Sequence, residues 1–223
     1  IWIRSASVAN PIAAGVKWHS KVKKICRYSS IVSVGNAYLA EFAKKYCSDV
    51  RIIPTVVDTE KYHNQIKLHR SEKVVIGWTG TFTNFGNLKL ILPVIRGLQE
   101  KYDFTFKIIA DKDPGYTDLQ YEYSAWKFET EIEDLLTFSI GIMPLKNEEM
   151  ENGKCAFKAI QYMSLGIPAV VSPVGANISL VQDGINGYLA DTNEHWAALL
   201  EKLIIAGACL VVTATKMRHL PKR

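Results

Sequence analysis

The sequence predicts an α/β fold in which helices cover both faces of a parallel β-sheet. Short apolar runs alternate along the chain with stretches in which apolar residues recur every three or four positions. This alternation is typical of βαβ units, which build parallel sheets. The composition agrees, because 48% of the 223 residues are hydrophobic and 22% are charged, as is usual for soluble α/β proteins. Ligands of such sheets bind outside the carboxyl ends of the strands.

The predicted strands are apolar runs bounded by glycine, proline or polar residues. They comprise residues 31–34, 50–53, 74–78, 104–110, 139–143 and 167–171, with a short extended piece at 120–123. Helices are expected over residues 1–27, from residue 36 onward, after residue 84 and over residues 129–138. In the helix after residue 84, Pro93 either introduces a kink or stands near the start of the helix.

The stretch 153–168 carries the clearest functional signal. Its apolar spacing predicts a short helix that packs on the core, and a glycine and a proline at its end are stop signals. An acidic loop at 146–152 precedes it, so Gly153 is expected where the chain enters the helix. The first N–H groups of a helix lack internal partners and carry the positive end of its dipole. Lys154 and Lys158 add positive charge on nearly the same side, which predicts an anion site suited to phosphate.

A second glycine-containing segment, residues 77–84, follows a predicted strand. Gly77, Gly80 and small polar residues such as Thr81 predict a loop that a diphosphate or a sugar can approach closely. A plain strand-to-helix turn explains the same residues. Because Gly80 and Gly153 both follow predicted strand ends, we expect them at the same edge of the sheet.

Neither the cysteines nor the histidines indicate a metal site. Cys26, Cys47, Cys155 and Cys209 lie far apart without a CxxC pair, so the sequence predicts neither a zinc site nor a disulfide framework, as expected of a reduced, cytosolic protein. The histidines are scattered and are interpreted as structural or solvated: His19, His63, His69, His195 and His219.

Charge is distributed unevenly along the chain. Residues 1–51 hold nine Lys or Arg against two carboxylates, a balance of 9 − 2 = +7, and the remainder sums to −2 because the net charge is +5. This split argues against a nucleic-acid groove over the whole protein. The basic end is either a solvated helix face, which we favour, or a contact for an anionic membrane or lipid. No apolar run reaches the roughly 18 residues of a membrane-spanning helix, and a start at Ile1 without methionine predicts a fragment.

Three motifs in register resemble the nucleotide-sugar-binding core of retaining glycosyltransferases of family 4, which have the GT-B fold. They are the segment 134–145, the run GKCAFKAIQYMSLGIPAVVSPVGANISLVQDGINGYLA and, within it, Asp183-Gly184-Ile185-Asn186-Gly187. The resemblance implies one Rossmann-like half of a GT-B fold. It assigns residues 1–34 to a remnant of the N-terminal acceptor domain, 35–73 to an interdomain connector and 74–205 to the C-terminal nucleotide-sugar-binding domain, followed by an irregular tail at 206–223.

The resemblance also implies site residues and a reaction. A sugar is transferred from a nucleoside diphosphate donor with retention of configuration, with Lys154 and Gln161 as catalytic residues and without a cofactor or metal. The implied donor-binding residues are Gly80, Thr81, Trp126, Gly153, Cys155, Ala156, Phe157 and Lys158. Trp126 either lines the pocket of the nucleotide base or belongs to an aromatic core. The Glu-x7-Glu pair of the family is replaced here by Gly153 and Gln161, of which only Gln161 offers a polar side chain.

Two other functions remain open from the sequence: a non-catalytic nucleotide-sugar-binding domain, and a nucleotide-sugar epimerase of GT-B architecture. The resemblance implies a nucleotide sugar, a glycan or glycolipid acceptor and a missing N-terminal domain as partners, and no nucleic acid. It further implies polysaccharide biosynthesis in the cytoplasm, with peripheral contact at the inner face of the membrane through the basic N-terminal segment. The donor sugar, its base and the acceptor are not specified.

Overall fold

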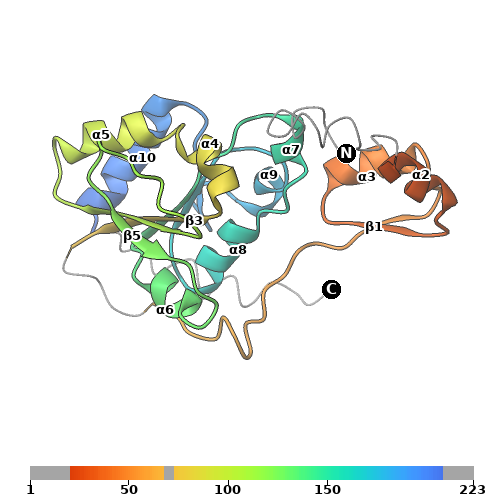
Figure 1. Ribbon diagram of the computed structural model, residues 1–223, viewed down its shortest axis with the longest axis horizontal. Helices are drawn as coiled ribbons and strands as arrows, with labels where there is room; N and C mark the ends of the chain where they lie inside the picture. The colour runs from red at the N-terminus through yellow and green to blue at the C-terminus, as the bar shows by residue number, and fades with distance from the viewer. Residues whose placement is uncertain (1–20, 68–72, 208–223) are drawn as a thin grey trace. The chain divides into compact units, whose positions relative to one another are not determined.

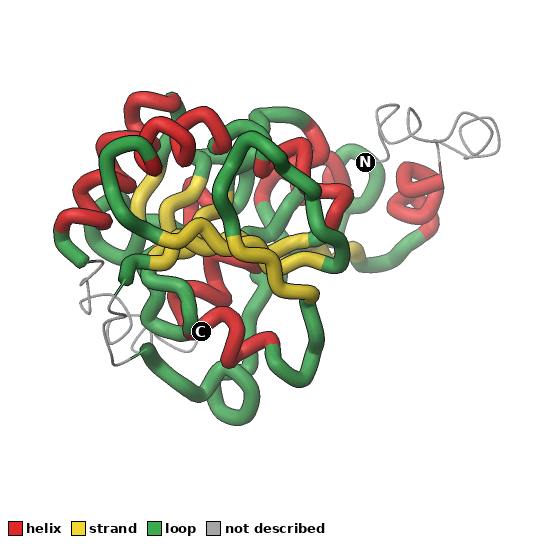
Figure 2. The backbone as a smooth tube through the Cα atoms, turned by 60° about the vertical axis from the view of Figure 1, so that its left-hand side comes forward, coloured by secondary structure: helices red, strands yellow, loops and turns green. Residues whose placement is uncertain are grey.

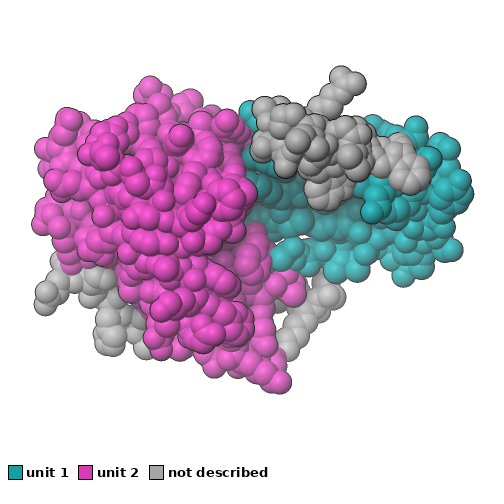
Figure 3. Space-filling model, viewed as in Figure 1, with its two compact units in different colours: residues 1–55, 147–156, 174–176 teal, residues 56–146, 157–173, 177–223 magenta. Residues whose placement is uncertain are grey.

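The computed structural model describes residues 21–67 and 73–207, which fall into two compact units (Figures 1 and 3). Unit 1 comprises residues 1–55, 147–156 and 174–176, and unit 2 comprises residues 56–146, 157–173 and 177–223. The predicted helix over 1–27 therefore lies mostly outside the described residues, as does most of the predicted tail at 206–223. The assignment of residues 1–34, 35–73 and 74–205 to domains stays a prediction.

Unit 2 is built on a six-stranded sheet in which every neighbouring pair is parallel. Its strands are β3 (Val75–Gly80), β4 (Thr105–Ala110), β5 (Glu122–Ala125), β6 (Ile140–Met143), β7 (Ala169–Val171) and β8 (Tyr188–Leu189). The order across the sheet is β5-β4-β3-β6-β7-β8. The chain thus adds β4 and β5 on one side of β3, then crosses to the other side and adds β6, β7 and β8. This order is that of a Rossmann-like sheet, with the topological switch point between β3 and β6.

Helices cover both faces of this sheet, as the sequence predicts (Figure 2). They are α4 (Phe85–Leu88), α5 (Leu92–Gln99), α6 (Glu131–Leu136), α8 (Phe157–Ser164), α9 (Asn177–Leu180) and α10 (Asn193–Ile205), with a 3₁₀ turn, η2, at Phe82–Asn84. The alternation of side chains along each strand divides the core between the faces. On β3, Ile76 and Trp78 belong to the apolar cluster that includes residues of α5 and α10, whereas Gly77 faces Phe138 on the other side.

Two helix-boundary signals are confirmed. Pro93 lies in the first turn of α5, where a missing N–H costs nothing, and α4 and α5 are separate helices. At the end of α8, Gly166 has a φ of +75°. There the N–H of Ile167 donates to the carbonyl of Tyr162 at 2.9 Å and that of Gly166 to the carbonyl of Met163 at 3.2 Å. This is the Schellman arrangement, which glycine favours.

Two glycines let large rings lie directly on the sheet. A Cβ at Gly141 of β6 would come within 2.4 Å of the ring of Tyr162 of α8, and a Cβ at Gly77 within 2.1 Å of the ring of Phe138. The prediction that residues 77–80 form a loop is wrong in this respect, because β3 continues to Gly80. Gly77 serves close packing in a strand rather than a turn.

We predict opposite effects for two Gly→Ala substitutions. Gly141→Ala should destabilise the chain by about 1–3 kcal/mol, since the new methyl group overpacks the contact with Tyr162. Gly97→Ala is the matched control: Gly97 lies inside α5 with nothing within 4 Å of its ideal Cβ. Alanine there should stabilise the chain by about 0.5–1 kcal/mol. Urea unfolding measures both, and equal stabilities of the two variants would contradict the packing argument.

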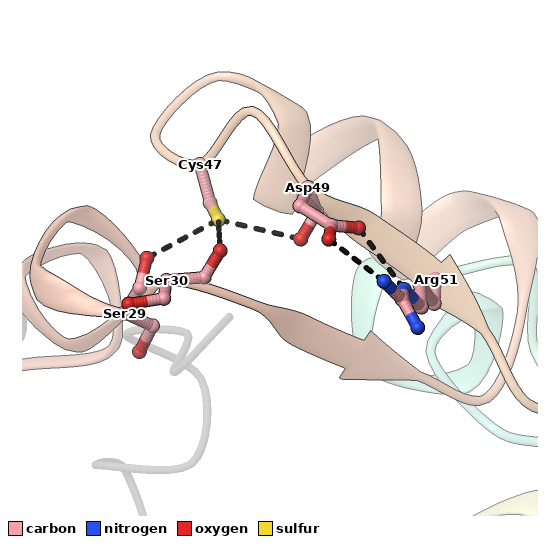
Figure 4. Close-up of polar contacts among 5 residues, drawn as sticks. All are labelled: Ser29, Ser30, Cys47, Asp49 and Arg51. Carbon is pink, nitrogen blue, oxygen red and sulfur yellow. Dashed lines mark hydrogen bonds and ion pairs between the residues drawn. The ribbon is translucent and has the colours of Figure 1, made fainter.

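Within its described residues, from residue 21 onward, unit 1 contains a small two-stranded sheet and three helices. Its elements are α2 (Lys21–Tyr28), β1 (Val32–Val34), α3 (Ala37–Lys44), β2 (Val50–Ile52) and α7 (Glu149–Asn152), and β1 pairs in parallel with β2. The buried thiol of Cys47 joins the turns at the ends of this sheet (Figure 4). Its Sγ lies 3.4 Å from the carbonyl oxygens of Ser29 and Asp49 and 3.9 Å from that of Ser30.

Asn36 connects α3 to a distant segment of unit 1. Its Oδ1 accepts a hydrogen bond from the N–H of Leu39 at 2.9 Å, so Asn36 is the N-cap of α3. Its Nδ2 donates to the carbonyl oxygens of Lys154 at 2.9 Å and Asn152 at 3.1 Å. One buried side chain thus satisfies three backbone groups and fixes the path of residues 152–154.

We predict that both functions of Asn36 are measurable by chemical unfolding. Asn36→Asp keeps the capping oxygen but loses the two donated hydrogen bonds, each of which contributes about 0.5–1.5 kcal/mol. Asn36→Ala loses the cap as well. The control is Thr192→Ala, which removes only the cap of α10, worth about 1 kcal/mol. An Asn36→Asp variant as stable as the unaltered chain would show that the contacts with residues 152 and 154 contribute nothing.

Candidate functional site

Unit 2 has a cavity of about 200 Å³ at the carboxyl ends of its strands. It is lined by Thr79, Gly80, Thr81, Asp111, Trp126, Glu131, Phe157, Lys158 and Gln161. These residues come from the end of β3, the positions directly after β3, β4 and β5, and the helices α6 and α8. The cavity lies where the strand order reverses and where ligands of doubly wound sheets bind.

Helix α8 contributes Phe157, Lys158 and Gln161 to the cavity. Gln161 follows Phe157 by four positions and Lys158 by three, so it lies on the same side of the helix as each of them. Phe157 was expected to pack on the core, but its side chain is 46% exposed because it lies at the rim. The first N–H groups of α8 begin at Phe157, and the helix dipole adds positive potential there.

Gly80 leaves room for the side chain of Lys158. A Cβ at Gly80 would lie 3.2 Å from Cε of Lys158 and 2.5 Å from the ring of Trp78. The structure therefore brings together two of the predicted donor-binding residues, a glycine at the end of β3 and a lysine in the first turn of α8. A glycine at this position gives a ligand direct access to the backbone at the end of the strand.

An aromatic and acidic group forms another wall of the cavity. The indole of Trp126 is 43% exposed, so the interpretation as an aromatic core is wrong. Its Nε1 donates to Oε1 of Glu131 at 3.0 Å. The hydroxyl of Tyr62 donates to the carbonyl oxygen of Phe128 at 2.8 Å and lies 3.3 Å from Oε2 of Glu131. Burial and the Glu131 carboxylate raise the pKa of the Tyr62 phenol, which stays a donor. Trp126 and Tyr62 thus both contact the Glu131 carboxylate, and the indole stays partly exposed where it lines the cavity.

Thr81 and Asp111 organise the turn after β3. Oδ1 of Asp111 accepts from the N–H of Phe82 at 2.7 Å, and Oγ1 of Thr81 accepts from Nδ2 of Asn84 at 2.9 Å. The hydroxyls of Thr81 and Thr83 are 2.7 Å apart. Thr81 lines the cavity as predicted, and its hydroxyl also holds the shape of the turn.

Gln161 contacts a histidine from the connector that precedes β3. Nε2 of Gln161 lies 3.4 Å from Nε2 of His63, and both side chains are buried. Burial lowers the pKa of His63, and the carboxylates of Glu131 and Asp58 act in the opposite direction. Gln161 thus lines the cavity and also contacts His63.

The other predicted site residues, Gly153 to Ala156, belong to unit 1. The expectation that Gly153 begins the helix is wrong: Gly153 caps α7, a short helix inside the predicted acidic loop, and α8 begins four residues later at Phe157. The N–H of Lys154 donates to the carbonyl of Glu151 at 3.0 Å, so it is not a helix-start amide. Both glycines were expected at one edge of the sheet because each was expected to follow a strand end. Gly80 is the last residue of β3, whereas α7 separates Gly153 from the preceding strand, β6.

Lys154 and its neighbours are closely packed within unit 1. Nζ of Lys154 lies 3.5 Å from Oε1 of the buried Glu151, and burial lowers the pKa of Lys154 while Glu151 raises it. Ala156 has a φ of +57°, a left-handed conformation that costs an alanine about 1–2 kcal/mol. The thiol of Cys155 fills the space beside Gly35, where a Cβ would lie 2.2 Å from Sγ.

Sequence reasoning missed four polar residues around the cavity: His63, Thr79, Asp111 and Glu131. Asp111 and Thr79 had a usable signal, because each stands at the carboxyl end of a predicted strand. His63 and Glu131 had none, since they reach the site only through the tertiary fold. Among residues 21–67 and 73–207, no group of three or more His, Cys, Asp or Glu side chains is placed to hold a metal ion. None of the helices in these ranges has the length and apolar character needed to cross a membrane.

Comparison with solved structures supports the fold. TarM superposes with a TM-score of 0.71 at 13% identity, covering 88% of this chain and 41% of TarM. HepE from Anabaena, solved in complex with UDP and glucose, gives a TM-score of 0.66 at 12% identity over 90% of this chain and 62% of HepE. The C-terminal domain of a glycosyl transferase group 1 family protein, LpcC from Francisella tularensis, gives 0.56 at 17% identity over 72% of this chain and 93% of that domain.

The chain thus spans less than two thirds of the length of TarM and of HepE. No curated protein sequence matches it. The sequence profile of one family, described as glycosyl transferases group 1, matches residues 73–206, which include all six strands of the large sheet and the whole cavity lining. Together with the GT-B-like half seen in the structure, this match shows that the chain belongs to the glycosyl transferases group 1 family, family 4 of the glycosyltransferases.

Proposed function

We propose that this chain carries the donor-binding part of a retaining glycosyltransferase, which transfers a hexose from a nucleoside diphosphate sugar to an acceptor. The observation that carries the proposal is the cavity at the switch point, closed on one side by the first turn of α8 with Lys158. A helix N-terminus beside a cationic side chain is suited to a diphosphate. The adjoining face of Trp126 is suited to a nucleobase or a sugar ring.

The protein's contribution to the reaction is electrostatic. As the glycosidic bond breaks, negative charge develops on the leaving diphosphate. The amides of the first turn of α8 and the ammonium group of Lys158 are in place before the reaction, so they stabilise this charge without reorganisation. Gln161, on the same side of α8, offers a neutral amide to donor hydroxyl groups.

Similar proteins whose structures contain a bound ligand support a nucleoside diphosphate as the class of ligand. HepE has been solved with UDP and glucose and with UDP-glucose, and a starch synthase IV catalytic domain with ADP and acarbose. These ligands are bound by those proteins, and they leave the base and sugar of this chain open. The acceptor, a glycan or glycolipid, is expected to bind outside the part matched to the family, because TarM and HepE are both considerably longer than this chain.

We predict that the chain binds at least one of UDP, GDP and ADP, and that Lys158→Ala weakens binding. Loss of one charged hydrogen-bond partner should cost about 1–3 kcal/mol, or roughly 5- to 150-fold in Kd. Isothermal titration calorimetry with the three nucleotides ranks the bases. Lys202→Ala, on the exposed side of α10, is the control and should leave Kd unchanged. A folded chain that binds none of the three would refute the proposal.

The role of Lys154 is a separate prediction that rests on the sequence resemblance. If its ammonium group contacts the diphosphate, Lys154→Ala weakens nucleotide binding by a similar factor, even though the same group lies near Glu151. Glu151→Gln removes the competing carboxylate and keeps the lysine, so it should leave binding equal or tighter. Unchanged affinity in Lys154→Ala would limit this lysine to a structural role in unit 1.

The neutral residues Gly153 and Gln161 favour one alternative, a nucleotide-sugar-binding domain without turnover, since the family's carboxylate pair is absent. Release of nucleoside diphosphate from a labelled donor separates the two functions. Steady release that depends on Lys158 supports the transferase. Tight donor binding without release, in the chain extended to the length of its relatives, supports the alternative.

A further inference from the structure

His63 is a buried titratable residue that the proposed reaction does not use. It lies in the connector between residue 55 and β3, its side chain is 3% exposed, and its backbone N–H donates to the carbonyl of Asp58 at 2.6 Å. The ring of Tyr62 packs edge-on against it, with the centroids 5.1 Å apart. In this enclosed position, Nε2 of His63 lies 3.4 Å from Nε2 of the Gln161 amide.

The contact couples the tautomer of His63 to the orientation of Gln161. Neutral imidazole has one N–H donor and one acceptor nitrogen, and a glutamine amide has a donor end and an acceptor end. Where Nε2 of Gln161 faces Nε2 of His63, the imidazole nitrogen must accept and the ring proton must be on Nδ1. A proton on Nε2 would instead require the amide to be rotated by half a turn.

Each arrangement presents a different group to the cavity. With Nε2 directed at His63, the carbonyl end, Oε1, is available to a ligand, and it accepts from hydroxyl groups. With the amide rotated, the cavity is offered an NH₂ group, which donates. Nδ1 of His63 is buried and has no hydrogen-bond partner among the described residues. A proton on Nδ1 is therefore an unpaired donor, which has a free-energy cost. The amide orientation of the structure requires that the contact with Gln161 offset this cost.

We propose that His63 is a positioning residue that holds the Gln161 amide with its carbonyl oxygen toward the cavity, so that the cavity presents an acceptor to hydroxyl groups of the donor. The inference rests on the proposed function for the identity of the ligand. The arrangement itself belongs to the ligand-free chain, because both side chains and their contact are part of unit 2.

The arrangement requires neutral His63, which gives it a defined pH dependence. The titratable groups that act on His63 are the carboxylates of Asp58 and Glu131, which raise its pKa, and burial outweighs them and lowers it. His63 is therefore neutral at pH 7. Below its pKa, Nε2 becomes a donor, the amide must present Oε1 to it, and the acceptor is withdrawn from the cavity.

Nuclear magnetic resonance on the ligand-free, ¹⁵N-histidine-labelled chain tests the arrangement directly. We expect the Nδ1–H tautomer for His63, assigned by comparison with His63→Gln. In Gln161→Glu, a carboxylate faces the ring, so the pKa of His63 should rise and the ring proton should occupy Nε2. His195, exposed on α10, is the internal control and should not respond. An Nε2–H tautomer in the unaltered chain, or a His63 indifferent to Gln161→Glu, would overturn the proposal.

Calorimetric titration with UDP, GDP or ADP, whichever binds tightest, tests the consequence for ligands. His63→Phe keeps the ring but loses the acceptor and should weaken binding about three- to tenfold, as expected for one lost hydrogen bond. His63→Gln restores an acceptor near the same place and should recover most of that loss. The ratio of Kd at pH 5.5 to Kd at pH 8 should be larger for the unaltered chain than for His63→Gln. Titration of the nucleotide itself affects both ratios equally, so it cancels when the two chains are compared.

The two experiments separate the inference from the proposed function. Equal affinities and equal pH ratios in all three chains would refute the positioning role even if nucleotide binds. If no nucleotide binds, the proposed function fails, and the tautomer and its response to Gln161→Glu still decide whether His63 orients the amide.

Discussion

The geometry of the cavity depends on one buried residue, Tyr162, and on the bare backbone that it lies against. Its ring packs on Gly141, where a side chain of any size would collide, and its hydroxyl accepts from the N–H of Thr79 at 3.2 Å and lies 3.4 Å from the carbonyl of Ile142. One side chain of α8 is therefore tied to β3 and to β6, the two strands on either side of the switch point. Burial raises the pKa of Tyr162, so the phenol stays protonated and this connection does not change with physiological pH. Because Phe157, Lys158 and Gln161 belong to the same helix, their positions at the cavity follow from that anchor.

Much of the fold could be predicted because its signals are local. The apolar runs that form β3, β4, β6 and β7, the place of Pro93 in α5 and the end of α8 at Gly166 each depend on residues close together in the sequence. The errors arose where a residue has two uses. Gly77 reads as a turn, yet it is in a strand because the ring of Phe138, 61 positions later, occupies the place of its side chain (138 − 77 = 61). Lys154 was predicted to lie at a helix start, yet the chain first completes α7, in which the carbonyl of Glu151 accepts a hydrogen bond from the N–H of Lys154.

The sequence predicts those site residues that lie at the end of a strand or in the first turn of a helix. It does not predict the residues that only the tertiary fold brings to the cavity. Gly80, Thr81 and Lys158 line the cavity because β3 ends there and α8 begins there. Glu131 and His63 come from α6 and the connector, whose sequences show only an acidic helix and an isolated histidine. Their importance depends on contacts with Trp126 and Gln161, which no local pattern encodes.

The discontinuity of unit 1 has a consequence for how this domain can be cut. The family profile begins at residue 73, and a fragment designed on it would contain every residue of the cavity lining. It would also retain residues 147–156 and 174–176, which belong to unit 1, but not Asn36, whose amide holds the carbonyl groups of Asn152 and Lys154. The smallest fragment in which the Gly153–Ala156 segment keeps its conformation therefore starts upstream of Asn36. The start of the family match at residue 73 and Asn36, which the fragment must contain, are thus more than thirty residues apart, since 73 − 36 = 37.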